Sequence, residues 1–366
     1  MPRPLLVVVM PSLRISGGNK EVVRLVQELL EQGGTDAVIA CMWKHPHEVE
    51  TNGIPVIHLS DTIPVRGSAL GQLPGIALGF RRLIRRLQTG AHGQLHLLLG
   101  HYSTYLAVFL APLLPRICFN QDMEWLFVRQ GWKRSLLKRA ILLTNRRSCV
   151  VTTNEFVTES YRANGVQPFG EASIWAEPRW LATSVSANRH IDVLMLLRGS
   201  GIKRLDLARE ALSLFQARTR LRVAVITPDT AIADSISGDL AQVFLRPSDD
   251  DMEAIFARSR VFLLLSDVEG FGLPPLEAMG SGCVPVCRDS GGVRCYMHGE
   301  FHELLFPLDR PVEEIVDAVA ERVRSGSLPT SAAAQQAFRD GLQASRASRE
   351  DCLRRLHQML CGPPTD

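Results

Sequence analysis

Short apolar runs that alternate with helical patterns constrain the fold of this chain most strongly. Residues 5–10 are apolar throughout, and Val22, Leu25, Val26 and Leu29 then recur at the spacing of one helix face. Further apolar runs, expected to form strands, lie at 37–41, 54–59, 95–99, 116–119, 191–197, 221–226, 243–245, 261–265 and 284–287. Strands that are buried on both faces and joined through helices belong to parallel sheets. The sequence therefore predicts an α/β fold with doubly wound parallel sheets.

The alternation stops once, at residues 168–190, a segment rich in proline, glycine and polar residues. We interpret this segment as a linker, because 366 residues fit two domains of about 100–200 residues each. The expected domains are 1–168 and 169–344. A last helix is expected within 345–366, and it can pack back on the first domain.

Composition argues against several classes of protein. A net charge of +3 on 366 residues is too small to indicate a nucleic-acid-binding protein. The eight cysteines form no C-x-x-C pair and no zinc pattern, which favours reduced thiols over disulfides. The apolar run at 5–10 is shorter than a signal-peptide core of about 7–15 residues or a membrane span of about 20. These features predict a cytoplasmic protein.

The most informative segment is 266–280, which reads Ser-Asp-Val-Glu-Gly-Phe-Gly-Leu-Pro-Pro-Leu-Glu-Ala-Met-Gly. It follows an apolar strand and opens a helix, and ligands of open α/β sheets bind at such strand ends. Gly270 and Gly272 let backbone amides approach a ligand closely. Glu277 is expected in the first helical turn, where a carboxylate can accept both hydroxyls of a ribose. A lone glutamate would more simply complement the helix dipole, but Glu269 and Glu277 around a glycine-rich turn favour a ligand site.

This segment resembles the signature of retaining GT-B glycosyltransferases of family four, which reads E-G-F-G-x-P-x-x-E-A. Glu269 and Glu277 match its two acids, and the close match covers roughly residues 240–325. The resemblance implies a GT-B architecture, in which two Rossmann-like parallel-sheet domains face a central cleft. The donor would bind the second domain and the acceptor the first. The resemblance also implies transfer with retention of the anomeric configuration, without a metal and without a cofactor, since the nucleotide sugar is a substrate.

The resemblance implies two cations for the donor diphosphate. The family carries an arginine and a lysine after the first strand of the second domain, and Arg198 and Lys203 stand there. The planar fork of arginine independently suits a diphosphate leaving group. Leu197 and Arg204 replace glycines of the family. Either Lys203 or Arg204 can therefore supply the second cation.

Other donor contacts are implied around the glycine-rich segments. Glu277 would hold the ribose, and Glu269 would position the transferred sugar with the help of backbone amides. These amides belong to Gly270, Phe271, Gly272 and Leu273. Gly17 and Gly18, between the first strand and helix, would let amides approach the donor phosphate. Two glycines alone also fit an ordinary tight turn.

The acceptor side is expected at two strand ends of the first domain. His101 follows the strand at 95–99, where the family places a histidine near the transferred sugar, and we count it as catalytic together with Glu269, Arg198 and Lys203. A packed or surface histidine is the alternative. Asp122 and Glu124 lie in a polar and aromatic cluster that suits a sugar acceptor. The cluster is similar to that of enzymes of bacterial surface-polysaccharide assembly, which suggests a glycan or lipid-linked acceptor, with rhamnose as one candidate donor sugar.

Two segments combine apolar and basic residues at helical spacing. Residues 80–87 place Phe80 and Leu83 on one face beside four arginines, and residues 132–147 repeat the pattern with six basic residues. The arginines of the first segment are Arg81, Arg82, Arg85 and Arg86. Such helices lie on anionic membranes, or they turn an apolar stripe to the core and a basic face to water. The sequence leaves both interpretations open.

Two other motifs are weighed against simpler explanations. Asp249-Asp250-Asp251 contains a D-x-D pattern that could bind a metal, but Ser248 with Asp251 predicts a helix capping box instead. Gly199-x-Gly201 is an incomplete dinucleotide fingerprint. An NAD(P)-dependent oxidoreductase, with Asp229 on the ribose, is therefore an alternative that leaves Glu269 and Glu277 unexplained. A non-catalytic subunit that binds nucleotide sugars is a further alternative.

Overall fold

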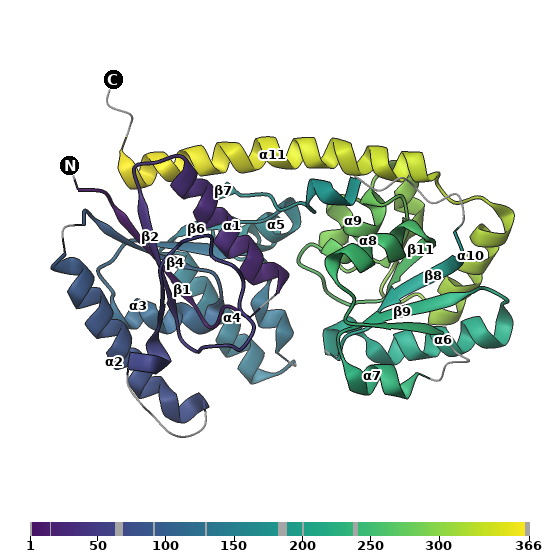
Figure 1. The fold of residues 1–366 in the computed structure, drawn as a ribbon, viewed down its shortest axis with the longest axis horizontal. Helices are drawn as coiled ribbons and strands as arrows, with labels where there is room; N and C mark the ends of the chain where they lie inside the picture. Colours follow the sequence, from purple (N-terminus) through teal and green to yellow (C-terminus); the bar gives the residue numbers. More distant parts are fainter. Residues whose placement is uncertain are drawn as a thin grey trace. The chain divides into compact units, whose positions relative to one another are not determined.

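The computed structural model describes residues 2–14, 16–62, 69–90, 92–128, 130–181, 189–199, 201–236 and 241–362. The chain divides into two compact units (Figure 1). Unit 1 consists of Met1–Ile174 and Arg346–Asp366, and unit 2 consists of Trp175–Ser345. Each unit is built on its own parallel sheet, so the predicted α/β fold with two parallel-sheet units is confirmed.

Unit 1 holds a sheet of seven strands among its described residues, in the order β3-β2-β1-β4-β5-β6-β7. Its strands are β1 (Leu5–Met10), β2 (Asp36–Cys41), β3 (Val56–His58), β4 (Leu95–Leu99), β5 (Arg116–Asn120), β6 (Cys149–Thr152) and β7 (Gly170–Glu171). Its α-helices are α1 (Gly17–Glu31), α2 (Ala69–Gln88), α3 (Leu106–Leu110), α4 (Trp132–Asn145) and α5 (Glu155–Arg162). Short 3-10 helices η1 (Leu59–Thr62), η2 (Tyr102–Tyr105) and η3 (Glu124–Phe127) follow β3, β4 and β5.

The sheet of unit 1 is buried on both faces because its central strands consist mostly of buried apolar residues. Leu5, Val7 and Val9 of β1 belong to one core cluster, and Leu6 and Val8 belong to the other. This alternation follows from the two-residue period of a strand. All ladder pairs of this sheet are parallel, so the carboxyl ends of its strands lie along one edge. Side chains that follow β1, β4 and β5 are thereby brought near one another.

Unit 2 holds a sheet of six strands among its described residues, in the order β10-β9-β8-β11-β12-β13. Its strands are β8 (Ile191–Leu196), β9 (Val223–Thr227), β10 (Gln242–Leu245), β11 (Ser259–Leu264), β12 (Val284–Arg288) and β13 (Leu305–Phe306). Its α-helices are α6 (Leu205–Arg218), α7 (Thr230–Ser235), α8 (Asp249–Ala257), α9 (Leu273–Gly280) and α10 (Val312–Ser325). The 3-10 helices are η4 (Pro178–Leu181), η5 (Gly201–Lys203), η6 (Gly292–Cys295) and η7 (Gly299–Leu304).

The last helix, α11 (Ser331–Cys361), contributes to both units and begins earlier than the expected segment 345–366 (Figure 1). In unit 2 it buries Phe338, and Gly341 lies so close to the ring of Trp175 that a Cβ would come within 2.1 Å of it. In unit 1, Arg349 is buried and its Nε donates to Glu28 of α1 at 2.5 Å. A glycine inside the helical pattern explains why the sequence did not predict the first half of α11.

Helix α2 turns its apolar stripe to the core of unit 1. Phe80, Leu83 and Ile84 are buried in one core cluster, whereas the four arginines beside them are exposed. Of the two interpretations of residues 80–87, the core-facing stripe with a solvated basic face is therefore correct. The apolar side of α2 is not available to a membrane.

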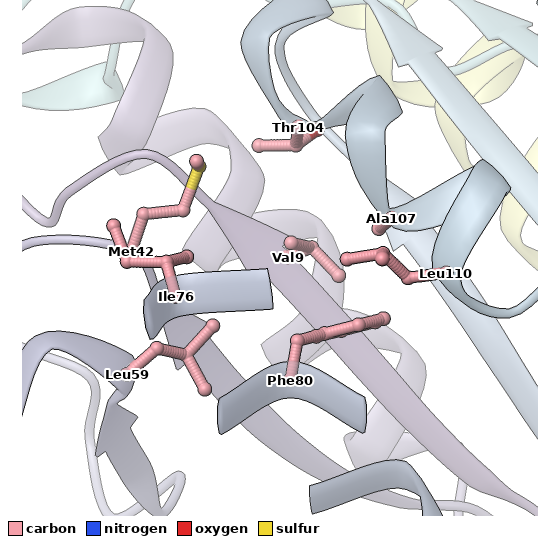
Figure 2. Close-up of a pocket in the computed structure, with 8 residues that line it drawn as sticks. All are labelled: Val9, Met42, Leu59, Ile76, Phe80, Thr104, Ala107 and Leu110. Carbon is pink, nitrogen blue, oxygen red and sulfur yellow. The ribbon is translucent and has the colours of Figure 1, made fainter. Parts of the chain in front are cut away.

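A small apolar pocket lies where α2 and α3 cover β1 (Figure 2). It is lined by Val9, Met42, Leu59, Ile76, Phe80, Thr104, Ala107 and Leu110. The space open to the centre of a water-sized sphere is about 10 Å³, which is room for about one water. The hydroxyl of Thr104 already donates to the carbonyl of His101 at 2.6 Å. The pocket is a packing gap rather than a binding site for a sugar.

Candidate functional site

The loop between β11 and α9, which carries Glu269, is held by a second loop after β12. The backbone N of Glu269 donates to the carbonyl of Ser290 at 2.9 Å, and the N of Gly292 donates to the carbonyl of Glu269 at 2.9 Å. A Cβ on Gly292 would lie 2.3 Å from the carbonyl oxygen of Gly270. Only a glycine permits this approach of two backbones. The Ser-Gly-Gly segment at 290–292 thus fixes the backbone around Glu269.

Helix α9 begins directly after a left-handed residue. Gly272 is the N-cap, with a φ of +82°, and its carbonyl accepts a hydrogen bond from the buried Tyr296 hydroxyl at 2.8 Å. The first turn contains no acidic residue, because the helix starts at Leu273 and Glu277 is its fifth residue. The expectation that Glu277 lies in the first turn is therefore wrong by about one residue. Glu277 is half-buried on the second turn.

Lys203 and Glu269 form an ion pair although 66 residues separate them. The Nζ of Lys203 lies 2.6 Å from Oε2 of Glu269, and both side chains are mostly buried. Lys203 ends η5 after β8, and Glu269 follows β11, which is the neighbour of β8 in the sheet. Adjacent parallel strands place their following loops side by side. Two residues predicted for the donor site are thus brought together.

Arg204 is engaged by two carboxylates. It is the N-cap of α6, and its Nη2 lies 2.7 Å from Oδ2 of Asp206 while its Nη1 lies 3.1 Å from Oδ1 of Asp267. The buried Arg288 holds the same Oδ1 of Asp267 at 2.6 Å. The sequence interpretation missed Asp267 and Arg288. A charged residue at the end of the buried strand 284–288 is the signal that could have indicated them.

Arg198 and the glycines of α1 lie on exposed backbone. Arg198 follows β8 and is exposed. Gly17 and Gly18 open α1 after the N-cap Ser16, and Gly18 accepts a hydrogen bond from the side chain of Gln121 at 2.9 Å. Gln121 follows β5, so it ties the start of α1 to the loop after another strand of unit 1.

His101 lies beside Glu124 in unit 1. Its Nδ1 accepts a hydrogen bond from the backbone N of Ser103 at 3.2 Å, so the proton of the neutral ring belongs on Nε2. Nε2 lies 3.6 Å from Oε1 of Glu124, and the other oxygen of Glu124 accepts from the backbone N of Tyr102 at 2.7 Å. Glu124 is 8% exposed. Glu124 is thus buried, whereas the side chain of His101 beside it remains 37% exposed.

Burial moves the pKa values of both members of this pair toward their neutral forms. Desolvation lowers the pKa of His101 below its ordinary range. Desolvation also raises the pKa of Glu124 to about 8, with a smaller contribution from Asp122, and the hydrogen bond from Tyr102 opposes this shift. Asp122 itself accepts a hydrogen bond from the backbone N of Met123 at 2.7 Å. At neutral pH the pair presents little net charge.

Asp251 of the D-x-D pattern and Asp229, the alternative ribose ligand, both cap helices. Ser248 and Asp251 form the predicted capping box at the start of α8. Asp229 caps α7 by accepting a hydrogen bond from the N of Ala231 at 2.9 Å. Among the residues that the structure describes, no cluster of three or more histidine, cysteine or acidic side chains is arranged to hold a metal ion. Within the same residues, no helix combines the length and apolar character needed to cross a membrane.

Comparison with known proteins identifies one family. Residues 185–337 match the family described as glycosyl transferases group 1. A putative glycosyltransferase 41 of Sulfolobus islandicus filamentous virus is 40% identical over 67 residues, which are 18% of each chain. The GDP-mannose:cellobiosyl-diphosphopolyprenol alpha-mannosyltransferase of Xanthomonas oryzae pv. oryzae is 36% identical over 59 residues, 16% of each chain. The aligned segments thus span less than a fifth of these relatives.

Solved structures resemble the chain over nearly its whole length. Sucrose-phosphate synthase from Thermosynechococcus elongatus has a TM-score of 0.71 at 13% identity and covers 98% of both chains. HepE of Anabaena, in complex with UDP-glucose, has a TM-score of 0.71 at 13% identity and covers 96% of this chain and 99% of its own. WaaG, a glycosyltransferase of lipopolysaccharide biosynthesis, has a TM-score of 0.67 at 11% identity, with 98% of this chain covered. Residues 185–337 therefore match the glycosyl transferases group 1 family, and the chain has the fold of GT-B glycosyltransferases.

Proposed function

We propose that the protein transfers a sugar from a nucleotide-sugar donor to a glycan or lipid-linked acceptor, with retention of the anomeric configuration and in polysaccharide biosynthesis. The observation that carries this proposal is the pairing of Lys203 with Glu269 at neighbouring strand ends of the group 1 domain. The names of similar proteins agree with a nucleotide-sugar donor. HepE is described with UDP-glucose, and the Xanthomonas relative is named for GDP-mannose.

The donor site would stabilise a diphosphate that leaves with its bonding electrons. Arg198 and Lys203 would neutralise the charge that builds on the bridging oxygen as the bond to the sugar breaks. Without a ligand, Glu269 pairs with the ammonium group of Lys203. When a diphosphate binds that ammonium group instead, Glu269 would turn toward the transferred sugar. Glu277 would accept the ribose hydroxyls. The amides of 270–273, and those of Gly17 and Gly18, would contact the sugar and the phosphates.

The acceptor side would use the His101–Glu124 pair, which carries little net charge, together with Asp122. His101 would hydrogen-bond a hydroxyl of the transferred sugar or the leaving oxygen, and Asp122 would contact the acceptor. Glu124 is buried, and its two oxygens face the backbone N of Tyr102 and the ring of His101. Its contribution would therefore pass through His101 rather than through direct contact with the acceptor.

A lipid-linked acceptor would bring the protein to the inner face of the cell membrane. Helix α4 exposes Trp132, Leu136 and Leu143, by 72%, 59% and 55%, and these residues share one helical face with the exposed Arg139. Lys133 is exposed beside Trp132. Exposed apolar side chains among basic ones fit the surface of an anionic bilayer. We therefore place the membrane contact on α4 and not on α2.

Sedimentation with liposomes tests this membrane contact. The protein should bind vesicles that contain phosphatidylglycerol, and salt should weaken the binding, because each basic residue contributes about 1 kcal/mol near an anionic surface. Trp132→Ala with Leu136→Ala should reduce binding, whereas Leu78→Ala on α2 should not. Equal binding to neutral and anionic vesicles, or none to either, would reject this contact.

A thermal-shift screen tests the donor class. Wild-type protein is mixed with UDP-, GDP-, TDP- and ADP-sugars and with NAD(P). Stabilisation by one nucleotide sugar, followed by release of its nucleoside diphosphate on transfer, is the expected result. Stabilisation by NAD(P) alone would reject the proposal in favour of an oxidoreductase.

A further inference from the structure

Arg204 has a backbone conformation that side chains other than glycine rarely adopt. Its φ is +48° and its ψ +55°, in the left-handed region, directly before α6. The family resemblance places a glycine at this position, and the observed φ explains why a glycine suits it. In this chain, hydrogen bonds from the Arg204 side chain to Asp206 and to Asp267 offset the cost of this backbone conformation.

Asp267 connects Arg204 to the ends of two other strands. Its Oδ1 lies 2.6 Å from Nη1 of Arg288, which is buried at the end of β12 and also donates to the carbonyl of Leu265 at 3.2 Å. The backbone N of Asp267 donates to the carbonyl of Ile202 in η5 at 2.9 Å. The loop after β8 is thus fastened to the loop after β11 through both backbone and side chains.

The neighbouring ion pair depends on this attachment. Lys203 and Arg204 are adjacent, and their partners Glu269 and Asp267 are two residues apart in the loop after β11. We propose that Asp267 is a positioning residue for the donor diphosphate: held by Arg288, it fixes Arg204 and the η5 loop so that Lys203 faces the phosphates. Arg204 then serves as the anchor of the loop, and Lys203 is the second phosphate cation. This inference rests on the proposed nucleotide-sugar site.

Calorimetry on the full chain tests the inference with UDP, GDP, TDP and ADP as probes, followed by variants with the tightest of the four. Asp267→Asn should weaken binding roughly tenfold, although it removes no group that touches the nucleotide. In the Arg204→Gly background the same substitution should change the affinity less than about twofold, because Asp267 acts through Arg204. Asp192→Asn, which removes another partner of arginines at the opposite end of β8, should leave the affinity unchanged.

A second variant covers the event that Asp267→Asn does not fold. Arg204→Lys keeps the charge but cannot bridge two carboxylates, so it should weaken binding roughly tenfold as well. Unchanged or tighter binding in Asp267→Asn or in Arg204→Lys would overturn the inference alone, since Arg204 would then be a phosphate cation that Asp267 restrains. An equal loss from Asp267→Asn with and without Arg204 would also overturn it. Wild-type protein that binds none of the four nucleotides would overturn the proposed function and this inference together.

Discussion

The candidate residues at the strand ends are charged in unit 2, whereas the pair His101 and Glu124 in unit 1 is largely neutral. In unit 2, Lys203 and Arg204 after β8 form ion pairs with Glu269 and Asp267 after β11. In unit 1, burial shifts the pKa values of His101 and Glu124 toward their neutral forms. Both sets follow strands of the same kind of parallel sheet, so the fold does not dictate the difference.

This difference matches the two halves of the proposed reaction. A diphosphate is a strongly charged leaving group, and fixed cations stabilise the charge that develops on it. A sugar hydroxyl is neutral, and an uncharged imidazole next to a mostly protonated carboxyl suits it better than an ion pair does. The comparison predicts that variants in unit 2 alter nucleotide binding and leaving-group departure, and that variants around His101 alter transfer alone.

The largest effect is expected from Lys203→Ala. Loss of a cation that strengthens its contact in the transition state should lower the transfer rate by roughly ten- to a hundredfold, while the protein stays folded. Turnover with the donor identified by thermal shift, together with circular dichroism, measures this. Lys44→Ala, an exposed lysine of unit 1, is the matched control. Normal turnover in Lys203→Ala would contradict the view that the charged residues of unit 2 stabilise the leaving diphosphate.

A smaller and more selective effect is expected from His101→Ala. The transfer rate should fall by roughly tenfold, since one hydrogen bond to the reacting sugar is lost, and the affinity for the nucleoside diphosphate should not change. Turnover and calorimetry on the same preparation separate the two quantities. His47→Ala, on an exposed loop of the same unit, should match wild type in both. Equal losses of affinity and rate would place His101 in the donor site instead.

The smallest effect is expected from Glu124→Gln, and it depends on pH. The pKa of Glu124 is about 8 in the folded protein, above its ordinary value of 4.5, so the folded state holds this proton more tightly than the unfolded state. Wild-type stability from this group is present below about pH 4.5 and is lost as the pH rises to about 8. Glutamine cannot ionise. The Tm of the variant minus the Tm of wild type should therefore be roughly 2 °C or more higher at pH 9 than at pH 5.

Thermal melts of both proteins at the two pH values measure this gain. Groups that titrate alike in the two proteins cancel from the difference. Glu159→Gln, on an exposed turn of α5, is the control and should show no such trend. A difference in Tm that is the same at pH 5 and pH 9 would show that Glu124 is not held in its neutral form.

The sequence predicted strand β11 and helix α9 because their pattern is local. The strand, the glycines and the two glutamates lie within one short segment, and Lys203 follows the neighbouring strand. The contacts of Asp267 were not predictable in the same way, since its partners Arg204 and Arg288 are 63 and 21 residues away and a carboxylate in a loop has no preferred partner by sequence. The second-turn position of Glu277 depends on the left-handed φ of Gly272, which the sequence permits but does not require.

Local sequence patterns also could not predict which face of a helix is buried. Residues 80–87 of α2 and residues 132–147, most of them in α4, both read as apolar and basic stripes, yet α2 buries its apolar side and α4 leaves Trp132 and Leu136 exposed. Burial is decided by which strands the helix covers, and the periodicity of one helix carries no information on that. The first half of α11 was missed for a related reason, because Gly341 is explained only by the ring of Trp175 packed against it.

The claim at the centre of this comparison is that unit 2 holds a nucleotide through Glu277, and calorimetry with the free nucleoside diphosphate tests it most directly. The ribose belongs to the nucleotide, so Glu277→Ala should weaken binding by roughly tenfold even without the sugar. Glu321→Ala, an exposed acid of α10, should bind as wild type does. Unchanged affinity in a folded Glu277→Ala protein would contradict the assignment of Glu277 to the donor and, with it, the placement of the nucleotide in unit 2.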